Sequence, residues 1–290
     1  MNDNMKLGIT ADMPNDAYHA APAIGSTGLK LLQQSPLHYW AACLDPNRVR
    51  RESTPAQRIG TAWHCAVFEP KAFVDRYVQI PDGLDRRTKE GKALWSEIQL
   101  SGREPMTPDA WDQIERMAGS ARLHPVSKVL FDHPEGAAET SMFWVDSETG
   151  VTCKIRPDYM VPPCKMFPNG LIVDGKTCED ASPEGFAKQA WNWDMLIQAA
   201  FYSDGFRFIF KTDMPPSFVW LAQEKDAPFA SAYYSAGEDL IAYGRKTYRR
   251  LLKMLADCQR ADQWPGYPQT VQSLELPAWA SKIVQEEVAA

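Results

Sequence analysis

The sequence lacks several features that would place it in a broad class at once. Its six cysteines contain no C-x-x-C pair, which argues against a zinc ribbon or a small disulfide scaffold. No stretch approaches the roughly 20 apolar residues that a membrane span needs, and the first residues lack the basic and then apolar pattern of a secretory signal. The sequence also lacks internal repeats and low-complexity tracts. We therefore expect a globular, cytoplasmic protein with no membrane partner.

Positive charge is also scarce. The chain has 31 Lys and Arg against 37 Asp and Glu, a formal net charge of −6. Because phosphate neutralisation dominates the affinity of proteins for nucleic acids, this balance argues mildly against binding DNA by bulk attraction. Basic residues nevertheless form three local clusters, which either line a DNA channel or are solvated helix faces. The clusters are Arg48, Arg50, Arg51 and Arg58; Arg86, Arg87, Lys89 and Lys92; and Arg245, Lys246, Arg249 and Arg250.

The pattern of apolar residues divides the chain into three parts. It predicts mainly helices over residues 1–135, strands and a helical stretch over 136–235, and a long helix with a tail over 236–290. We expect Ser26 to cap the first helix, and Pro55 and Pro108 to occupy the first positions of two further helices. The charged stretch from residue 81 is expected to be an exposed loop that leads into a short helix over 93–100.

The central part reads as strands followed by a helix. Three β-branched or aromatic runs, at 137–146, 150–160 and 170–177, are separated by turn signals and predict a three-stranded meander. A helical pattern follows over 182–210, with a break near Trp191. Two more strands are expected at 217–224 and 229–236.

Two aspartates stand near the ends of the second and third runs. Two ionised carboxylates about 4 Å apart repel by roughly 4 kcal/mol at an effective dielectric near 20, so such a pair is unfavourable unless a cation lies between them. Mg²⁺ prefers oxygen ligands, and Asp158, Asp174 and a main-chain carbonyl of the second strand would suit it. Lys176 shares a strand face with Asp174 and can orient a metal-bound water for phosphodiester hydrolysis. The alternative is that the aspartates flank turns and one is ion-paired to Lys176.

The order of motifs resembles a known nuclease signature. "PD", a hairpin and then "DGK" resemble the PD-(D/E)xK pattern, and the helical "IGTAWH" resembles the G-x-x-x-H segment of the RecB-like branch. "QAAFY" resembles the Q-x-x-x-Y motif of the helix that follows the sheet, where a spacing of four places both residues on one face. These motifs comprise His64, Asp158, Asp174, Gly175, Lys176, Gln198 and Tyr202.

Longer segments are similar to the nuclease domain of RecE-type exonucleases, also called exodeoxyribonuclease VIII. "YHAAPAIGSTGLKLLQQSPLHYWA", "RIGTAWHCAVFEP", "KIRPDYM" and "VDGKTCEDASPEGFAKQAWNWDMLIQAAFY" carry the resemblance, which covers residues 18–224. It implies an α/β fold with a restriction-endonuclease-like core, in which helices flank a central mixed β-sheet behind an N-terminal helical region. We therefore expect residues 1–290 to form a single, stand-alone nuclease domain.

The resemblance also implies roles for individual residues. His64, Asp158, Asp174 and the carbonyl of Gly175 would hold Mg²⁺ or Mn²⁺, and Lys176 would position the attacking water. Gln198 and Tyr202 would support the lysine and the scissile phosphate. Glu139 would correspond to an acid that assists a second metal, whereas Arg156 would either contact a DNA phosphate or pair with an acid. Ser35-Pro36 and a lone late cysteine, Cys258, depart from the iron–sulfur members of the group, so no Fe–S cluster is expected.

The activity implied is 5′-to-3′ digestion of double-stranded DNA ends, which leaves 3′ overhangs for phage or prophage recombination. The resemblance further implies a single-strand annealing protein of the RecT type as partner and a homo-oligomeric ring around DNA. Trp191, Trp193 and Phe201 would serve as wedges or stacking groups, or else as core or interface residues. Two other functions remain open: a catalytically inactive nuclease fold that binds DNA or protein, and an endonuclease that acts on branched or single-stranded DNA.

Overall fold

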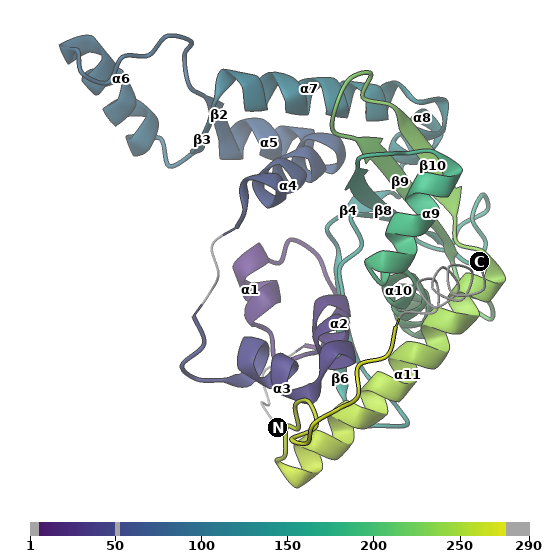
Figure 1. Ribbon diagram of the computed structural model, residues 1–290. Helices are drawn as coiled ribbons and strands as arrows, with labels where there is room; N and C mark the ends of the chain where they lie inside the picture. Colours follow the sequence, from purple (N-terminus) through teal and green to yellow (C-terminus); the bar gives the residue numbers. More distant parts are fainter. Residues whose placement is uncertain (1–5, 50–52, 277–290) are drawn as a thin grey trace, which may run out of the picture.

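A central mixed β-sheet flanked by helices forms the middle of the molecule (Figure 1). The computed structural model describes residues 6–49 and 53–276. Among them, a five-stranded sheet has the order β10-β9-β8-β7-β4, in which β8 and β9 are parallel and the other neighbours antiparallel. Its strands are β4 (Ala137–Ala138), β7 (Tyr159–Val161), β8 (Leu171–Cys178), β9 (Ser217–Glu224) and β10 (Ser231–Ser235). The α/β architecture predicted from the sequence is confirmed.

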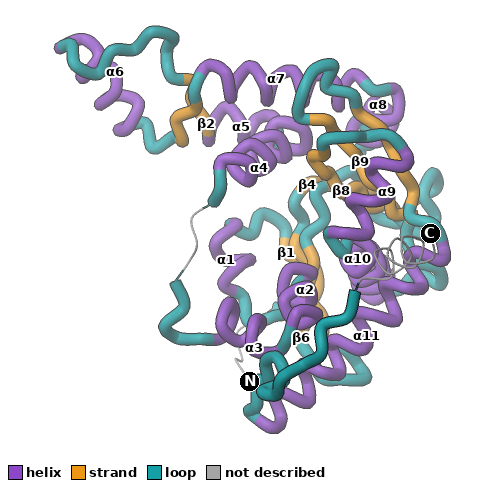
Figure 2. Tube along the Cα trace, in the orientation of Figure 1, coloured by secondary structure: helices purple, strands orange, loops and turns teal. Residues whose placement is uncertain are grey.

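Two smaller sheets accompany the central one. One has the order β1-β5-β6, and the other pairs β2 with β3 in parallel. Their strands are β1 (Gly8–Thr10), β5 (Ser141–Val145), β6 (Thr152–Ile155), β2 (Tyr77–Gln79) and β3 (Glu104–Met106). The strands of the two larger sheets lie between groups of helices (Figure 2). In the described part of the chain, no helix is long and apolar enough to cross a membrane.

Most helices begin where the sequence provides a proline or a capping hydroxyl. Thr54 and Gln57 form a reciprocal capping box, and the side chains of Thr88, Thr107 and Ser182 each accept an N–H of the first turn, which satisfies donors that lack a partner within the helix. The helices are α1 (Asn15–Ala20), α2 (Ser26–Gln34), α3 (Pro36–Tyr39), a π-helical turn (Trp40–Leu44), α4 (Pro55–Phe68), α5 (Pro70–Arg76), α6 (Lys89–Leu100), α7 (Pro108–Leu123), α8 (Pro125–Phe131), α9 (Pro183–Asn192), α10 (Met195–Phe210) and α11 (Glu238–Ala261).

The central sheet is covered on both faces, and each face has its own hydrophobic core. Alternate residues of a strand point to opposite faces, and β8 shows this directly. Ile172 packs into a core with residues of α2, α10 and α11, whereas Leu171 and Val173 pack into a second core with α4 and α7. Burial on both faces explains the uninterrupted apolar start of this strand. The acidic and basic residues that follow it are therefore placed at a protected depth.

The expected three-stranded meander is wrong. The first two apolar runs each contribute to two different sheets: β4 and β7 belong to the central sheet, whereas β5 and β6 form a hairpin in the other one. The first run changes sheet at Glu139, which has a φ of 47°, and the second at Arg156-Pro157, where the proline has no N–H to donate to a ladder. Strands commonly switch sheets at such breaks.

Two helix boundaries also differ from expectation. Gly25, not Ser26, occupies the N-cap of α2, and the helix ends at Ser35, whose hydroxyl accepts the N–H of His38 and starts α3. The helix after the charged loop begins at Lys89, earlier than expected, because the Thr88 side chain caps it. The predicted break in the helical stretch is present, at Trp193 and Asp194, between α9 and α10.

Candidate active site

Asp158 and Asp174 meet at the end of the β7–β8 pair. Tyr159 of β7 lies opposite Val173 of β8 in an antiparallel register, so the residue before β7 approaches the residue after Val173. The Gly175 N–H donates to Asp158 Oδ2 across 2.6 Å, which fixes the orientation of this carboxylate. The two acids are thus brought together from separate runs, as the motif spacing predicts.

Asp174 is 1% exposed, and two side chains hold it in place. Gln198 Nε2 on α10 donates to Asp174 Oδ1 at 2.6 Å. Lys176 forms an ion pair with Asp174 Oδ2 and reaches the Gly175 carbonyl at 3.3 Å. Asp174 Oδ2 has no hydrogen-bond donor in the described structure apart from this ion-pair contact. Asp174 and Lys176 therefore share a strand face, and Gln198 of α10 fixes the orientation of the Asp174 carboxylate.

Helix α4 brings His64 to the same place. His64 Nδ1 lies 3.2 Å from Asp158 Oδ2, and both side chains are partly accessible, at 27% and 16% exposure. The helix can approach β8 closely because Gly175 has no side chain: a Cβ there would lie 2.9 Å from Phe68 and 3.0 Å from Trp63, both on α4. The glycine of the D-G-K segment is thus required by helix packing.

The electrostatics of the three groups are interdependent. Burial disfavours the ionised form of Asp158. The pKa of Asp158 nevertheless lies below its usual range, because His64 contributes a charge and a hydrogen bond and Lys176 contributes a further charge. Burial likewise disfavours the imidazolium, yet Asp158 keeps the pKa of His64 raised. Burial and the nearby Asp158 raise the pKa of Asp174. The site therefore holds two close carboxylates, of which the more deeply buried one is the harder to ionise.

Glu139 lies beside Asp158 at the point where the first run changes sheet. Its N–H donates to the Asp158 carbonyl at 3.2 Å, and burial, followed by the charge of Asp158, raises the pKa of Glu139 to about 8. Arg156 Nη1 lies 4.0 Å from Glu139 Oε2. The remaining contacts of Arg156 point inward, to Ser141 Oγ at 2.8 Å and the Met13 carbonyl at 2.7 Å. Arg156 therefore pairs with an acid and anchors the N-terminal segment.

Tyr202 and an unexpected lysine complete the surroundings. Burial, followed by the charges of Asp174 and Asp158, raises the pKa of Tyr202, which places its hydroxyl near both acids. Lys30 of α2 was not predicted; burial and then the charge of Lys176 lower its pKa, so the two ammonium groups face the same region. No motif spacing marks Lys30, since α2 is distant in sequence and is brought to the sheet only by tertiary packing.

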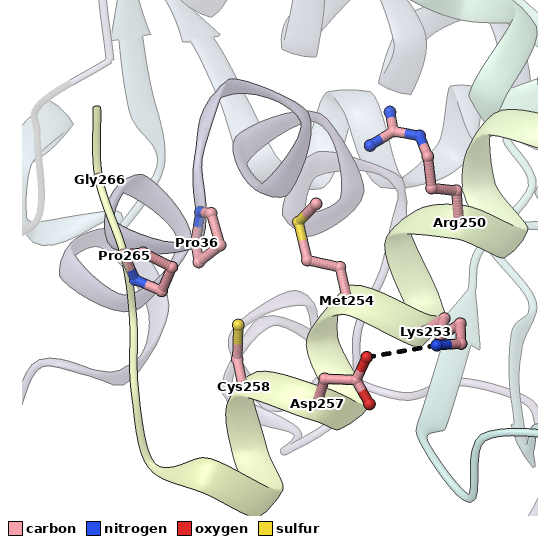
Figure 3. Close-up of a pocket in the computed structure, with 8 residues that line it drawn as sticks. All are labelled: Pro36, Arg250, Lys253, Met254, Asp257, Cys258, Pro265 and Gly266. Carbon is pink, nitrogen blue, oxygen red and sulfur yellow. Dashed lines mark ion pairs between the residues drawn. The ribbon is translucent and has the colours of Figure 1, made fainter. Parts of the chain in front are cut away.

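A metal could be held by a limited set of groups here. The candidates are His64, Asp158, Asp174 and the Gly175 carbonyl, with Glu139 next to them. Within the described residues, no three His, Cys, Asp or Glu side chains already stand at metal-binding positions. A separate surface pocket, lined by Pro36, Met254 and Pro265 among others, contains none of the predicted site residues (Figure 3).

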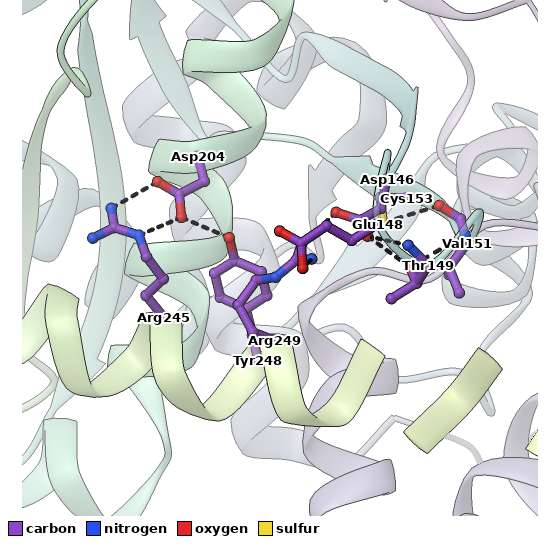
Figure 4. A network of polar contacts seen from close by, with 9 residues as sticks. All are labelled: Asp146, Glu148, Thr149, Val151, Cys153, Asp204, Arg245, Tyr248 and Arg249. Carbon is purple, nitrogen blue, oxygen red and sulfur yellow. Dashed lines mark hydrogen bonds and ion pairs between the residues drawn. The ribbon is translucent and has the colours of Figure 1, made fainter. Parts of the chain in front are cut away.

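The basic residues of the three clusters differ in the contacts that they make. Arg50 and Arg51 lie outside the described residues. Arg245 pairs with Asp204 of α10, and Arg249 pairs with Asp146 and Glu148 of the β5–β6 turn (Figure 4). These two arginines therefore fasten α11 to the rest of the fold. In the middle cluster, Arg87 pairs with Asp85, and Arg86 stacks on the Trp95 ring at 3.4 Å. Trp95 lies on α6, which projects from the main body (Figure 1).

The three candidate stacking residues also separate. Phe201 is 0% exposed and packs against Trp144, with ring centroids 5.1 Å apart, so of the two roles left open for it, it has that of a core residue. Trp191 and Trp193 are 58% and 67% exposed. Both lie where α9 passes into α10.

Comparisons with known proteins agree with this architecture. The profile of a family described as "PDDEXK-like domain of unknown function (DUF3799)" matches residues 25–277. No curated protein matches the sequence. A crystal structure from Eubacterium rectale, of a protein that carries only the provisional name of exonuclease, aligns with a TM-score of 0.56 at 16% identity over 90% of this chain and 97% of that chain. The protein SSO0001 aligns over 68% of this chain and 86% of its own, with a TM-score of 0.30 and 14% identity, which is too low to carry an argument. The first likeness shows a shared fold.

Proposed function

The chain belongs to the family of PDDEXK-like domains (DUF3799), and we propose that it is a metal-dependent deoxyribonuclease that hydrolyses phosphodiester bonds. One observation carries the proposal: Asp158 and Asp174 meet on neighbouring strands, with Lys176 on Asp174 and His64 on Asp158. Two ionised carboxylates in such proximity repel each other, and positive charge near both of them offsets the repulsion. A purely structural ion pair would require neither the second acid nor the imidazole.

The residues present suit a hard divalent cation. Two carboxylates, an imidazole and a main-chain carbonyl form the donor set, and the buried Asp174 Oδ2 is contacted by the Lys176 ammonium group without any further donor among the described residues. We propose that His64, Asp158, Asp174 and the Gly175 carbonyl hold Mg²⁺, for which Mn²⁺ can substitute. The bound ion would lower the pKa of a coordinated water and neutralise charge on the phosphate.

The protein's own groups then have distinct tasks. Gln198 holds Asp174 Oδ1, and the Gly175 N–H holds Asp158 Oδ2, so both carboxylates are oriented before substrate arrives. Lys176, 22% exposed, would orient the attacking water and stabilise developing negative charge with its ammonium group. Tyr202 would support Lys176 and the scissile phosphate, and Glu139 would assist a second cation.

The finer features of the proposal are supported by the motif resemblance. We propose 5′-to-3′ degradation of double-stranded DNA ends that leaves 3′ overhangs for phage or prophage recombination. This task would be carried out in the cytoplasm by a homo-oligomeric ring, with a single-strand annealing protein of the RecT type as partner. The resemblance of residues 18–224 to RecE-type nuclease domains is the support for each of these features.

An end-specific digestion tests the proposal. Linear duplex DNA labelled at one defined 5′ end is incubated with and without Mg²⁺, alongside a covalently closed circle of the same sequence. We expect Mg²⁺-dependent release of label from the linear duplex and an intact circle. Lys176→Ala should lower the rate by on the order of 10²-fold or more.

A matched lysine variant provides the control. Lys253→Ala removes a 78% exposed lysine of α11 that pairs only with Asp257 on its own helix, and it should leave the rate unchanged. Cleavage of the closed circle would favour the endonuclease function. Binding of DNA without any metal-dependent cleavage would favour the inactive nuclease fold, and full activity of Lys176→Ala would remove that lysine from the mechanism.

A further inference from the structure

Two tryptophans at the junction of α9 and α10 are exposed to an unusual degree. Trp191 and Trp193 are 58% and 67% exposed, and among the described tryptophans they alone are exposed large apolar residues. The Trp191 ring contacts the ring of Tyr243 on α11, with centroids 5.3 Å apart, and Tyr243 is itself 50% exposed. Indole groups left in water in this way mark an interaction site more often than isolated exposed aliphatic residues do.

The turn that carries these rings is held in a fixed position. Trp193 is the C-cap of α9, and its carbonyl accepts a 2.6 Å hydrogen bond from Lys30 Nζ on α2. Gln33, one turn further along α2, donates to Asp194 Oδ1 at 2.8 Å. Asp194 has a φ of 51°, a left-handed conformation that few residues adopt without support. Two side chains from α2 therefore stabilise a sharp turn that presents indole rings to solvent.

The same turn is attached directly to the candidate active site. Gln189, in the last turns of α9, donates to the Thr177 carbonyl at 3.0 Å, next to Lys176 on β8. On the other side of the turn, α10 carries Gln198, which holds Asp174. Trp193 lies between these two attachments. The turn that carries Trp193 is thus attached on both sides to β8, the strand that holds Asp174 and Lys176.

Lys30 adds charge of the right sign between the rings and the site. Its ammonium group is fixed at the turn itself, because Nζ donates to the Trp193 carbonyl, and a cation held there attracts an anion such as a phosphate. An ammonium group next to exposed aromatic rings suits a single strand of nucleic acid, in which phosphates alternate with bases that are free to stack.

We propose that Trp191 and Trp193 form a base-stacking subsite for single-stranded DNA, with Lys30 contacting a phosphate of the same strand. The inference rests on the proposed function, which it extends from the scissile bond to the unpaired strand beside it. Paired bases are already stacked within a duplex, so the subsite discriminates in favour of unpaired bases.

Binding without hydrolysis tests this subsite separately from catalysis. The probe is a fluorescently labelled twelve-nucleotide oligo(dT), titrated in EDTA and followed by anisotropy. The double variant Trp191→Ala/Trp193→Ala should weaken binding by about ten-fold or more, as expected for the loss of one or two stacked bases. The double Phe variant keeps two aromatic faces and should stay within about three-fold of the wild type. Binding of a blunt hairpin duplex should change by less than about two-fold.

A matched aromatic variant serves as the control. Phe208→Ala removes a 52% exposed ring from α10, about 20 Å along the helix from Met195 at 1.5 Å per residue, and should leave oligo(dT) binding unchanged. Circular dichroism verifies that each variant is folded.

Several outcomes would overturn the subsite. These are unchanged oligo(dT) binding in the double Ala variant, an equal loss for duplex and single strand, and an equal loss in Phe208→Ala. Sedimentation that shows the double variant dissociating an oligomer while oligo(dT) binding persists would assign the rings to contact with a second copy of the chain. If the wild type cleaves duplex DNA but does not bind oligo(dT), the subsite fails and the nuclease proposal stands. If it does neither, both fail.

Discussion

Replacement of Gly175 by alanine tests whether α4 is packed against β8 as described. The added Cβ would lie 2.9 Å and 3.1 Å from two atoms of the Phe68 ring and 3.0 Å from Trp63, whereas carbon atoms attract best at about 3.5–4.0 Å. Neither ring can withdraw easily, because Trp63 is 0% exposed and Phe68 packs edge-on against Phe131. Overpacking of this kind lowers stability by about 1–3 kcal/mol.

The matched control is Gly119→Ala in α7. A Cβ at this helical glycine meets no heavy atom within 4 Å, so the substitution should raise stability by about 0.5–1 kcal/mol through helix propensity. Urea unfolding followed by tryptophan fluorescence measures both variants. We expect a lower midpoint for Gly175→Ala at an unchanged slope.

The two variants should also differ in nuclease activity. Moving β8 and its neighbour β7 away from α4 separates the Asp158 carboxylate from His64, so Gly175→Ala should lose activity at temperatures where it is still folded, while Gly119→Ala keeps it. Wild-type stability and activity in Gly175→Ala would refute both the close contact and the reason given for the glycine in the D-G-K segment.

Three further predictions concern other parts of the molecule. The pKa of Glu139 is raised to about 8, so between about pH 4.3 and 8 the folded state holds a proton that the unfolded state has released. The free energy of unfolding should therefore fall as pH rises through that window. Glu139→Gln should reduce the fall by about 1.4 kcal/mol per unit of pKa shift removed, when the wild type and the variant are both unfolded in EDTA. Arg156→Met leaves the Met13 carbonyl and Ser141 without a donor, so it should lower stability by at least about 1 kcal/mol and speed proteolysis of the N-terminal segment; unchanged proteolysis would contradict its anchoring role. Thr54→Ala should lower stability by about 1 kcal/mol through loss of the capping box of α4, whereas Thr54→Ser should be neutral in thermal unfolding.

Local features of the sequence predicted most of the helices and the shared strand face of Asp174 and Lys176. The capping and proline signals before α4, α7 and α9 act within a few residues, so they can be recognised without knowing the rest of the fold. The register of Asp174 and Lys176 follows from strand alternation alone, and their ion pair agrees with it. These predictions succeed because the interactions behind them connect residues that are close in sequence.

Features that depend on contacts between distant segments were missed. The division of two runs between two sheets, the parallel pairing of β2 with β3, and the approach of Lys30 to Lys176 are all set by tertiary packing. Arg156 shows the same limit. It stands two residues before Asp158, yet one of its hydrogen bonds goes to Met13 in the N-terminal segment, 143 residues away in sequence.

The seam between the two sheets explains why the acids gather where they do. A regular strand in this sheet directs its side chains into one of two buried cores, where an ionised carboxylate is strongly unfavourable. Glu139 and Asp158 are not fully buried in either core, because each stands at a break where a run leaves one sheet for the other. Their side chains remain 31% and 16% exposed. Asp174 lies on the uninterrupted β8, is 1% exposed and requires Gln198 and Lys176. The breaks in regular pairing are thus what allow a cluster of acids to reach solvent at the edge of a closed core.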